Sequence, residues 1–288
     1  MAGNFWKSSH YEQWILDKQD LYRQRGEDIK IIGEEEYHKI MIFFINYIQA
    51  MGNQLGSRQQ MIATASVYFR RFYARRSLKD IDPFLLSISC LHLAAKVDEH
   101  GNTSPSKLSN AANQLAKMHP CIPPDDGRMS KLITEVEFYL LEIMDCCLIV
   151  YHPYRTALQL FSDLKLKESD DKLKRDTYGL MNDSLKTDAC LLFAPHQIAI
   201  ACLLGATINN NKEDEMRPWF QELAVDYDSV FEILRMITSA YKRARSVDIS
   251  HGHNNNENIK SLLAKIPKPN PPSSTNQNSN QSMMQQFR

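Results

Sequence analysis

Lys96 and Glu137 are the residues best placed by type and spacing to do chemistry. Lys96 directly follows the largely apolar stretch from Phe84 to Ala95, and a cation buried there without a partner would be costly. The carboxylate of Glu137, 41 residues further along on the next long helical pattern, could pair with it. Such a pair would leave both groups able to bind the carbonyls and amides of a partner. The simpler alternative is that Lys96 lies at a helix C-terminus, where a cation is favoured by about 0.3–1 kcal/mol.

Three aromatic residues near the N-terminus could contact a partner. Phe5 and Trp6 stand among polar residues ahead of the first expected helix. Paired aromatics in such a place act either as interaction anchors or as a staple that pins a helix to the core. Trp14, within that helix, is a further candidate for partner contact.

A run of arginines is a second candidate binding feature. Arg70 and Arg71 are followed by Arg75 and Arg76, and Arg58 lies earlier on the same expected helix. Guanidinium groups in such a cluster could bind phosphate or an acidic partner. The more usual outcome for a run of this kind is a solvated helix face.

The sequence carries no recognisable catalytic or cofactor motif. It has no glycine-rich nucleotide loop, no His-Glu-x-x-His helix and no Ser/His/Asp arrangement. The six cysteines include no Cys-x-x-Cys pair, and His251 and His253 have no metal-binding residue immediately beside them. We therefore expect neither an enzyme nor a protein that holds a metal or another cofactor.

Composition restricts both the partners and the compartment. The 34 basic residues balance the 34 acidic ones, so the net charge is zero, which argues against direct binding of nucleic acid. No apolar run approaches the roughly 18 residues that span a bilayer, and the N-terminus has no signal-peptide pattern. Cysteines within apolar helical patterns are typical of free thiols in the cytoplasm or nucleus. We expect no membrane partner.

Hydrophobic spacing predicts an all-α protein. Apolar residues recur at intervals of three and four from Ile40 to Met51, and again from Leu132 to Ile143, where the inward stripe includes Tyr139. A helix is expected to begin at Ser57, with Gln60 completing a capping box. No segment alternates as a hairpin strand would.

Two segments are apolar on almost every face, and both begin with proline. One follows Pro83 and an Asp82 cap, the other follows Pro195, 112 residues further on. Each is too short to span a membrane, so each is expected at the centre of a helical bundle. Equal units at this spacing predict a duplicated bundle. The alternative is one large helical protein that simply contains two buried helices.

The chain ends differ from these two bundles in composition. An extra N-terminal helix is expected from about Ser9 to Arg25. Beyond residue 249 the chain is rich in Asn, Gln, Ser and Pro, and such a segment buries too little apolar area to order itself. Ile259 and Leu262 keep helical spacing, so one short helix could dock there. The expected domains are 1–33, an N-terminal segment; 34–150 and 151–248, the two bundles; and 249–288, a mostly disordered tail.

Several motifs make the sequence resemble the cyclin family. The end of the first apolar helix, Leu-Ala-Ala-Lys-Val-Asp-Glu at 93–99, is similar to the L-A-S-K-x-E-E signature of the cyclin box. Further matches are Asn-Phe-Trp at 4–6, Trp-Ile-Leu-Asp-Lys at 14–18, Val-Tyr-Phe-Arg-Arg-Phe-Tyr at 67–73, Glu-Phe-Tyr-Leu-Leu-Glu at 137–142 and Val-Tyr-His-Pro-Tyr at 150–154. The resemblance covers roughly residues 1 to 250 and implies two tandem five-helix cyclin boxes.

The resemblance also implies a kinase-binding surface. In cyclins the signature lysine and a glutamate on the fifth helix hydrogen-bond the backbone of a kinase, and these correspond to Lys96 and Glu137. The same comparison implies a contact surface made of Ala94, Val97, Asp98, Glu99, Leu141, Cys146 and Leu148. Many cyclins have Phe in place of Cys146, and Asp98 replaces the usual Glu with a shorter side chain.

The resemblance is strongest to the transcriptional branch of cyclins. The stretch from Glu35 to Met41 lacks the arginine and tryptophan of the groove with which cell-cycle cyclins dock substrates. The implied function is that of a nuclear regulatory subunit of a Mediator-associated cyclin-dependent kinase, in contact with other subunits of Mediator's kinase module. One alternative is a general transcription factor of the same fold that binds promoter DNA. A scaffold with a degenerate kinase surface is less favoured, because Lys96 and Glu137 are both present.

Overall fold

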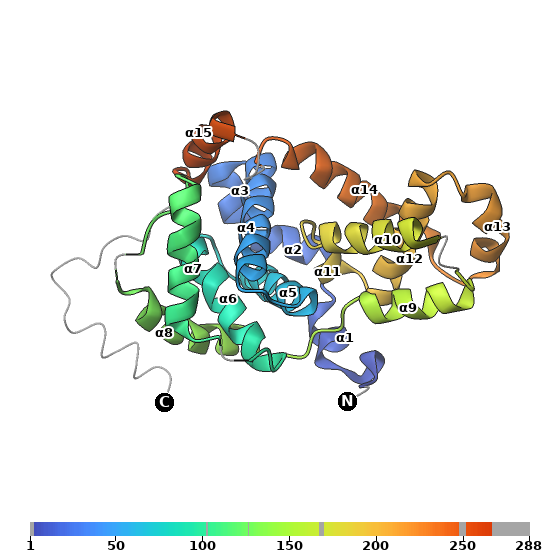
Figure 1. Cartoon of the computed structure of the whole chain (residues 1–288), viewed down its shortest axis with the longest axis horizontal. Coiled ribbons are helices and arrows are strands. Elements are labelled where there is room, and N and C mark those ends of the chain that lie inside the picture. The colour runs from blue at the N-terminus through green and yellow to red at the C-terminus, as the bar shows by residue number, and fades with distance from the viewer. Residues whose placement is uncertain (1–2, 102, 126, 167–169, 248–251, 267–288) are drawn as a thin grey trace.

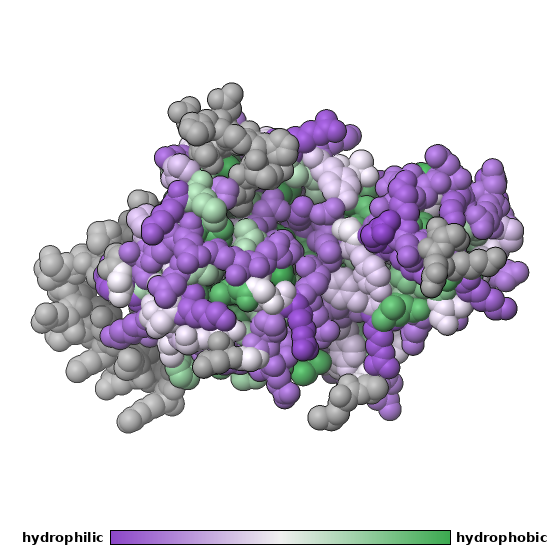
Figure 2. All heavy atoms as spheres, viewed as in Figure 1, coloured by the Kyte–Doolittle hydropathy of each residue, from purple (hydrophilic) through white to green (hydrophobic). Residues whose placement is uncertain are grey.

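The computed structural model describes residues 3–101, 103–125, 127–166, 170–247 and 252–266. Every regular element within these ranges is a helix. The all-α prediction and the two tandem bundles are confirmed, and Figure 1 shows the two bundles in opposite halves of the molecule. Each bundle has its own hydrophobic cluster. Figure 2 shows a largely hydrophilic face with small apolar patches.

The helices follow one another in chain order through the two bundles. The first bundle consists of α4 (Glu34–Gln54), α5 (Gln59–Arg75), α6 (Pro83–Val97), α7 (Pro105–Met118) and α8 (Met129–Ile143). The second consists of α9 (Tyr154–Asp163), α10 (Asp171–Ser184), the short α11 (Ala189–Leu192), α12 (Pro195–Asn209), α13 (Glu213–Glu222) and α14 (Tyr227–Ala244).

The two proline-initiated helices lie at the bundle centres, as the sequence predicts. Helix α6 contacts α4, α5, α7 and α8, while α12 contacts α9, α10, α13 and α14. Asp82 caps α6 by accepting the Phe84 N–H at 2.7 Å. Ala194 lacks a capping oxygen, and the side chain of Gln197 instead accepts the Ala194 N–H at 3.0 Å. A helix surrounded by helices must be apolar on every face, which explains both segments.

The N-terminal segment corrects the expectation of one helix. It forms a 3-10 turn, Phe5–Lys7, followed by α1 (Ser9–Trp14), α2 (Lys18–Gln24) and α3 (Gly26–Ile32). The chain is extended at Ile15, and Asp17 begins a new helix by accepting the Gln19 N–H at 2.7 Å. The Leu16 N–H donates to the Leu191 carbonyl at 2.7 Å, which ties this segment to the second bundle.

The start of α5 also differs from expectation. The helix begins at Gln59 with Arg58 as its N-cap, and no side chain caps it. The hydroxyl of Ser57 has no hydrogen-bond partner, so the predicted capping box with Gln60 is wrong. The segment turns sharply just before it, where Gly56 has a positive φ of 66°. The Ser57 N–H donates instead to the Gly52 carbonyl at 2.9 Å, which places Ser57 in the turn and outside the helix.

A last helix, α15 (Gly252–Leu263), returns to the first bundle and contacts α4. Ile259 and Leu262 are buried, which confirms the short docking helix. Lys265 pairs with Glu36 of α4 at 2.5 Å. Residues 248–251 and 267–288 lie outside the described part of the chain, and with them most of the expected disordered tail.

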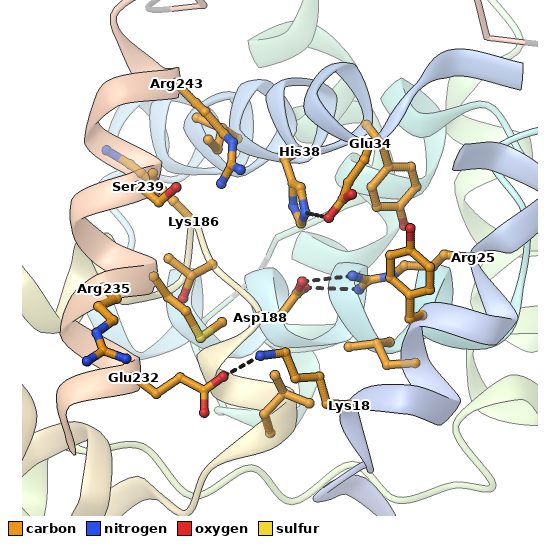
Figure 3. Close-up of a pocket in the computed structure, with 18 of the residues that line it drawn as sticks. Lys18, Arg25, Glu34, His38, Lys186, Asp188, Glu232, Arg235, Ser239 and Arg243 are labelled. Carbon is orange, nitrogen blue, oxygen red and sulfur yellow. Dashed lines mark hydrogen bonds and ion pairs between the residues drawn. The ribbon is translucent and has the colours of Figure 1, made fainter. Parts of the chain in front are cut away.

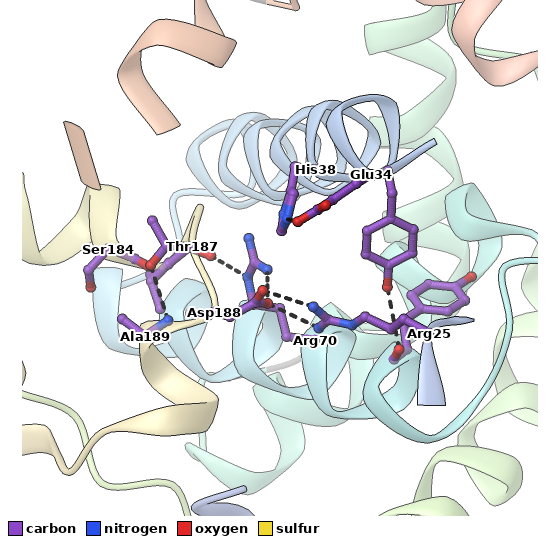
Figure 4. A network of polar contacts seen from close by, with 11 residues as sticks. Arg25, Glu34, His38, Arg70, Ser184, Thr187, Asp188 and Ala189 are labelled. Atoms are coloured by element: carbon purple, nitrogen blue, oxygen red, sulfur yellow. Dashed lines mark hydrogen bonds and ion pairs between the residues drawn. The ribbon is translucent and has the colours of Figure 1, made fainter. Parts of the chain in front are cut away.

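The two bundles and the N-terminal segment are joined by buried charges (Figure 4). Asp188, just before α11, accepts two hydrogen bonds from Arg25 of the N-terminal segment, at 2.8 and 3.0 Å. It accepts a third from Arg70 of α5 at 2.9 Å. Burial alone would raise the pKa of Asp188, but the charges of Arg25 and Arg70 outweigh it and hold that pKa well below its usual range.

The interior position of the arginines corrects the expectation of a solvated face. Arg70 and Arg71 are 1% and 0% exposed. Arg70 also donates to the Leu185 carbonyl at 2.6 Å, and Arg71 donates to the Cys147 carbonyl at 2.9 Å. These acceptors lie on segments remote from α5 in sequence, so local periodicity could not predict them.

Replacing Asp188 by Asn should lower the free energy of unfolding by about 3–5 kcal/mol, because two buried guanidinium groups lose their counter-charge. The pKa of Asp188 is depressed in the folded chain, so its contribution is complete above the unfolded value of about 4 and is lost as pH falls below it. Urea unfolding at pH 7 and across the acid range measures both effects.

The control for this variant is Asp214→Asn. Asp214 is 96% exposed, and among the described residues its one ion pair is with the exposed Arg217 on the same helix. Its replacement should change stability by less than about 1 kcal/mol. Equal losses in the two variants would contradict a special role for the buried carboxylate.

A second stability prediction concerns the crossing of α4 and α5. A Cβ on Gly52 would overlap the Cγ1 and Cδ1 atoms of Ile62, whereas a Cβ on Gly179 would meet nothing within 4 Å. Alanine is the better helix former, so Gly179→Ala should raise stability by about 0.5–1 kcal/mol. Gly52→Ala should lower it by about 1–3 kcal/mol, because the helices must separate. Thermal melts of the two variants should therefore shift in opposite directions.

Candidate functional site

Lys96 and Glu137 form an ion pair at the surface of the first bundle. The Nζ of Lys96 lies 2.7 Å from each carboxylate oxygen of Glu137. Lys96 is in the last turn of α6, and Glu137 is on α8, whose buried Val136 and Leu140 fix the helix against α6. The Lys96 side chain is 52% exposed, while that of Glu137 is 12% exposed. The ammonium group of Lys96 can therefore donate to a partner, while the carboxylate of Glu137 is held in place.

His92, which the sequence did not suggest as a site residue, lies next to the Glu137 carboxylate of this pair. Its Nε2 lies 3.6 Å from the Glu137 carboxylate, and its Nδ1 lies 3.1 Å from the Thr103 carbonyl. Burial lowers the pKa of His92, and the positive charge of Lys96 lowers it further. The spacing of four residues between His92 and Lys96 on one helix was the available signal.

The other expected contact residues differ in exposure. Val97, Leu141 and Leu148 are half-buried around the pair, and Glu99 and Cys146 are exposed. Ala94 is fully buried, so the expectation that it lies on the contact surface is wrong.

The carboxylate of Asp98 forms a hydrogen bond within the chain. Its carboxylate accepts a hydrogen bond from the Thr64 hydroxyl at 3.0 Å, and the same hydroxyl oxygen lies 2.9 Å from Nε2 of His152. Burial raises the pKa of Asp98, and the Thr64 hydrogen bond partly offsets that rise. The short aspartate side chain therefore links α6, α5 and the connection between the two bundles.

Three backbone positions just after α6 and α8 have positive φ, one of them Asp145 with a φ of 51°. Glu99 follows α6 with a φ of 50°, and Cys146 follows α8 with a φ of 54°. Both lie in the left-handed region that side-chain-bearing residues enter at a cost. At Cys146 the backbone N–H donates to the Leu141 carbonyl at 2.9 Å, which ends α8. The chain therefore turns sharply after the C-terminal end of α6 and again after that of α8.

Large apolar side chains lie exposed on α8 and just after it. Phe138 is 70% exposed, Tyr139 57% and Ile149 61%. The expectation that Tyr139 points into the core is wrong, because Ile133, Val136 and Leu140 already fill that face. Residues 138–141 are four consecutive apolar residues, so spacing alone could not show which of them face the core. Exposed aromatics beside an ion pair are typical of interaction surfaces.

The N-terminal aromatics divide into buried and exposed positions. Trp14 is fully buried, with the guanidinium carbons of Arg71 and Arg75 at 4.7 and 4.2 Å from its rings, so its expected role as a surface contact is wrong. Phe5 is half-buried, and its ring centroid lies 5.6 Å from that of Tyr151, as expected for a staple. Trp6 is 54% exposed.

The remaining candidate residues form no binding site within the described part of the chain. Arg58 is exposed at the start of α5. No group of three metal-ligating side chains occurs among the described residues, and the side chains of His251 and His253 fall outside them. Within the described helices, none has the length and apolar character needed to cross a membrane.

Comparisons with known proteins identify both bundles. The model of the cyclin N-terminal domain matches residues 13–149, and that of the cyclin C-terminal domain matches residues 152–246. Cyclin-C of Drosophila melanogaster is 49% identical over 94% of this chain and 99% of its own length. Cyclin-C of Rattus norvegicus is 46% identical over 94% of this chain and 93% of its own.

Solved structures share the fold at low sequence identity. A chain of the CAK complex of Chaetomium thermophilum bound to ATP-γ-S matches with a TM-score of 0.69 and 18% identity, over 98% of this chain and 94% of that chain. A chain of the yeast TFIIK complex matches with a TM-score of 0.61 and 24% identity, over 82% and 99% of the respective chains. With two matched domain models and relatives near half identity over nearly the full length, the chain belongs to the cyclin family.

Proposed function

We propose that this chain is the regulatory subunit of a cyclin-dependent kinase of the Mediator complex, and that it regulates transcription by RNA polymerase II in the nucleus. The observation that carries the proposal is the Lys96–Glu137 pair, with 2.7 Å contacts and a half-exposed lysine. Support comes from the high identity to proteins named Cyclin-C and from the fold shared with chains of kinase complexes. Other subunits of the Mediator kinase module are proposed as further partners.

The proposed mechanism is positional. Kinase activity requires an internal Lys–Glu ion pair that forms only when one helix of the small lobe is turned inward. A rigid cyclin surface that binds the inward state about 4 kcal/mol more tightly shifts that equilibrium roughly a thousandfold. Lys96 would donate to backbone carbonyls of the kinase, and Glu137 would accept from its amides, as charge-assisted hydrogen bonds.

The apolar surroundings would supply the rest of the binding energy. Val97, Leu141, Leu148 and the exposed Cys146 remain the proposed contact residues from the sequence, with Glu99 at the edge. Phe138 and Tyr139 add large exposed rings next to Glu137. Burial of such rings excludes water from the central pair and strengthens its hydrogen bonds.

The second candidate function is binding of promoter DNA by the same fold. It requires a basic face, but the net charge is zero and the central arginines of the basic run, Arg70 and Arg71, are buried. Arg58 remains exposed. These observations favour the kinase partner.

Reversing both charges of the central pair tests the proposal most sharply. In the double variant Lys96→Glu with Glu137→Lys, the ion pair within the chain can re-form, so the fold should stay intact. The donors and acceptors offered to a kinase are exchanged, however, and several charge-assisted hydrogen bonds are lost. Binding to a Mediator-associated kinase should fall at least roughly a hundredfold, measured by co-purification and by titration of kinase activity.

A matched exchange on α8 provides the control. Lys131 and Glu135 form an exposed pair at 3.7 Å on the same helix, away from α6. Exchange of these two charges should leave kinase binding unchanged. Undiminished binding by the Lys96/Glu137 exchange would remove the basis for the proposed contact.

A salt titration distinguishes the two candidate functions. Phosphate contacts release counterions, so a DNA-binding protein loses affinity steeply as salt rises. The full chain should show only weak binding to a duplex at low salt. Tight binding with a steep salt slope would instead favour the promoter-binding alternative.

A further inference from the structure

A cavity of about 620 Å³ opens where the N-terminal segment, the first bundle and α14 meet (Figure 3). Its walls come from α2, from the start of α4, from residues 186–188 and from one face of α14. None of the proposed kinase contacts lines it. Its volume lies within the range of small-molecule and side-chain binding sites. The cavity is therefore a separate site on this cyclin.

The charged groups around the cavity are mostly basic. Five cationic side chains and three anionic ones line it, an excess of two positive charges among the lining residues of a chain whose net charge is zero. Lys186 and Arg243 also pair with Asp183 and Glu35, which lie outside the lining. The cations are Lys18, Arg25, Lys186, Arg235 and Arg243, and the anions are Glu34, Asp188 and Glu232. Walls of low dielectric concentrate such an excess and attract anions.

The floor of the cavity keeps an uncompensated positive charge. Arg25 and Asp188 line the cavity, and Arg70, which does not line it, shares the single carboxylate of Asp188 with Arg25. Both arginines are at least nine-tenths buried, and the Nε of Arg25 and one Nη of Arg70 have no hydrogen-bond partner. The two guanidinium groups and one carboxylate leave a positive charge behind the cavity wall, which favours an anion in the cavity through long-range attraction.

The rim cations differ in how firmly other side chains hold them. Arg235 is exposed and forms no ion pair among the described residues. Lys18 pairs with Glu232 across the cavity at 2.5 Å, but their side chains are 74% and 36% exposed, so the pair contributes little. Arg243 extends from α14 on the side of His38 in Figure 3, and it donates two hydrogen bonds of 2.9 Å to Glu35, which lies outside the cavity lining.

We propose that this cavity binds a phosphorylated serine or threonine in a segment of a partner protein. A phosphate monoester carries a charge of about −1.5 to −2 at neutral pH, which matches the excess of two positive charges. Its three terminal oxygens suit planar guanidinium groups such as those of Arg235 and Arg243. The exposed ring of Tyr22 at the rim offers a surface for flanking peptide residues.

Three degenerate peptide libraries test the proposal with the full chain. They share random flanks and differ only at a fixed central residue, which is phosphoserine, serine or glutamate. The immobilised chain should retain the phosphoserine library at least roughly tenfold more than either of the others. The best-retained phosphopeptide is then titrated by fluorescence anisotropy, and inorganic phosphate should compete with it.

Charge reversals on α14 locate the binding site. Arg235→Glu and Arg243→Glu should each weaken the phosphopeptide by about tenfold or more, the effect of losing a charge-assisted contact. Lys242→Glu is the matched control, because Lys242 lies on the same helix, changes the net charge equally and does not line this cavity. It should change affinity by less than about twofold.

Each remaining outcome also decides the question. Equal retention of the serine library, or an equal effect of Lys242→Glu, would overturn the proposal. Equal retention of the glutamate library would overturn the choice of phosphate in favour of an acidic segment. Kinase binding and the melting temperature of each variant are measured alongside. Because Arg235 is exposed and unpaired, its variant should fold and bind kinase normally, so this test is independent of the proposed function.

Discussion

Burial of charge at the junction of the two cyclin boxes is the constraint on which the rest of the structure depends. Arg25 comes from the N-terminal segment, Arg70 from the first box and Asp188 from the second. One carboxylate neutralises both guanidinium groups, and each would be very costly in the interior without it. Because the hydrogen bonds require specific directions, they fix the three segments relative to one another.

Helix α5 connects this junction to the end of α6 that carries Lys96. It carries Arg70 at the junction, and two turns earlier it carries Thr64, which bonds Asp98 at the end of α6. Thr64 also lies against His152, in the connection between the boxes. The end of α6 that carries Lys96 and the connection between the boxes are thus held by one helix. The kinase contact proposed for Lys96 and Glu137 would require such rigidity, because small displacements weaken charge-assisted hydrogen bonds.

The sequence predicted the positions of the helices better than it predicted which of their side chains are buried. The two apolar helices that begin at Pro83 and Pro195, and the docking of Ile259 and Leu262, follow from local spacing and are confirmed. The exposed face of Tyr139 and the break at Asp17 were missed. A run of consecutive apolar residues, such as 138–141, does not show which of them face the core. Helix propensity does not show that the Asp17 side chain caps a new helix.

By itself the sequence determined the helical class, the duplication and the pairing of Lys96 with Glu137, because each depends on the type and spacing of residues within helices or on a shared family signature. Only the tertiary structure decided that Arg70 and Arg71 are internal and that cations from five separate positions surround one cavity. The reason is physical. A basic side chain is stable in water or beside a buried acceptor, and only long-range packing brings that acceptor to it.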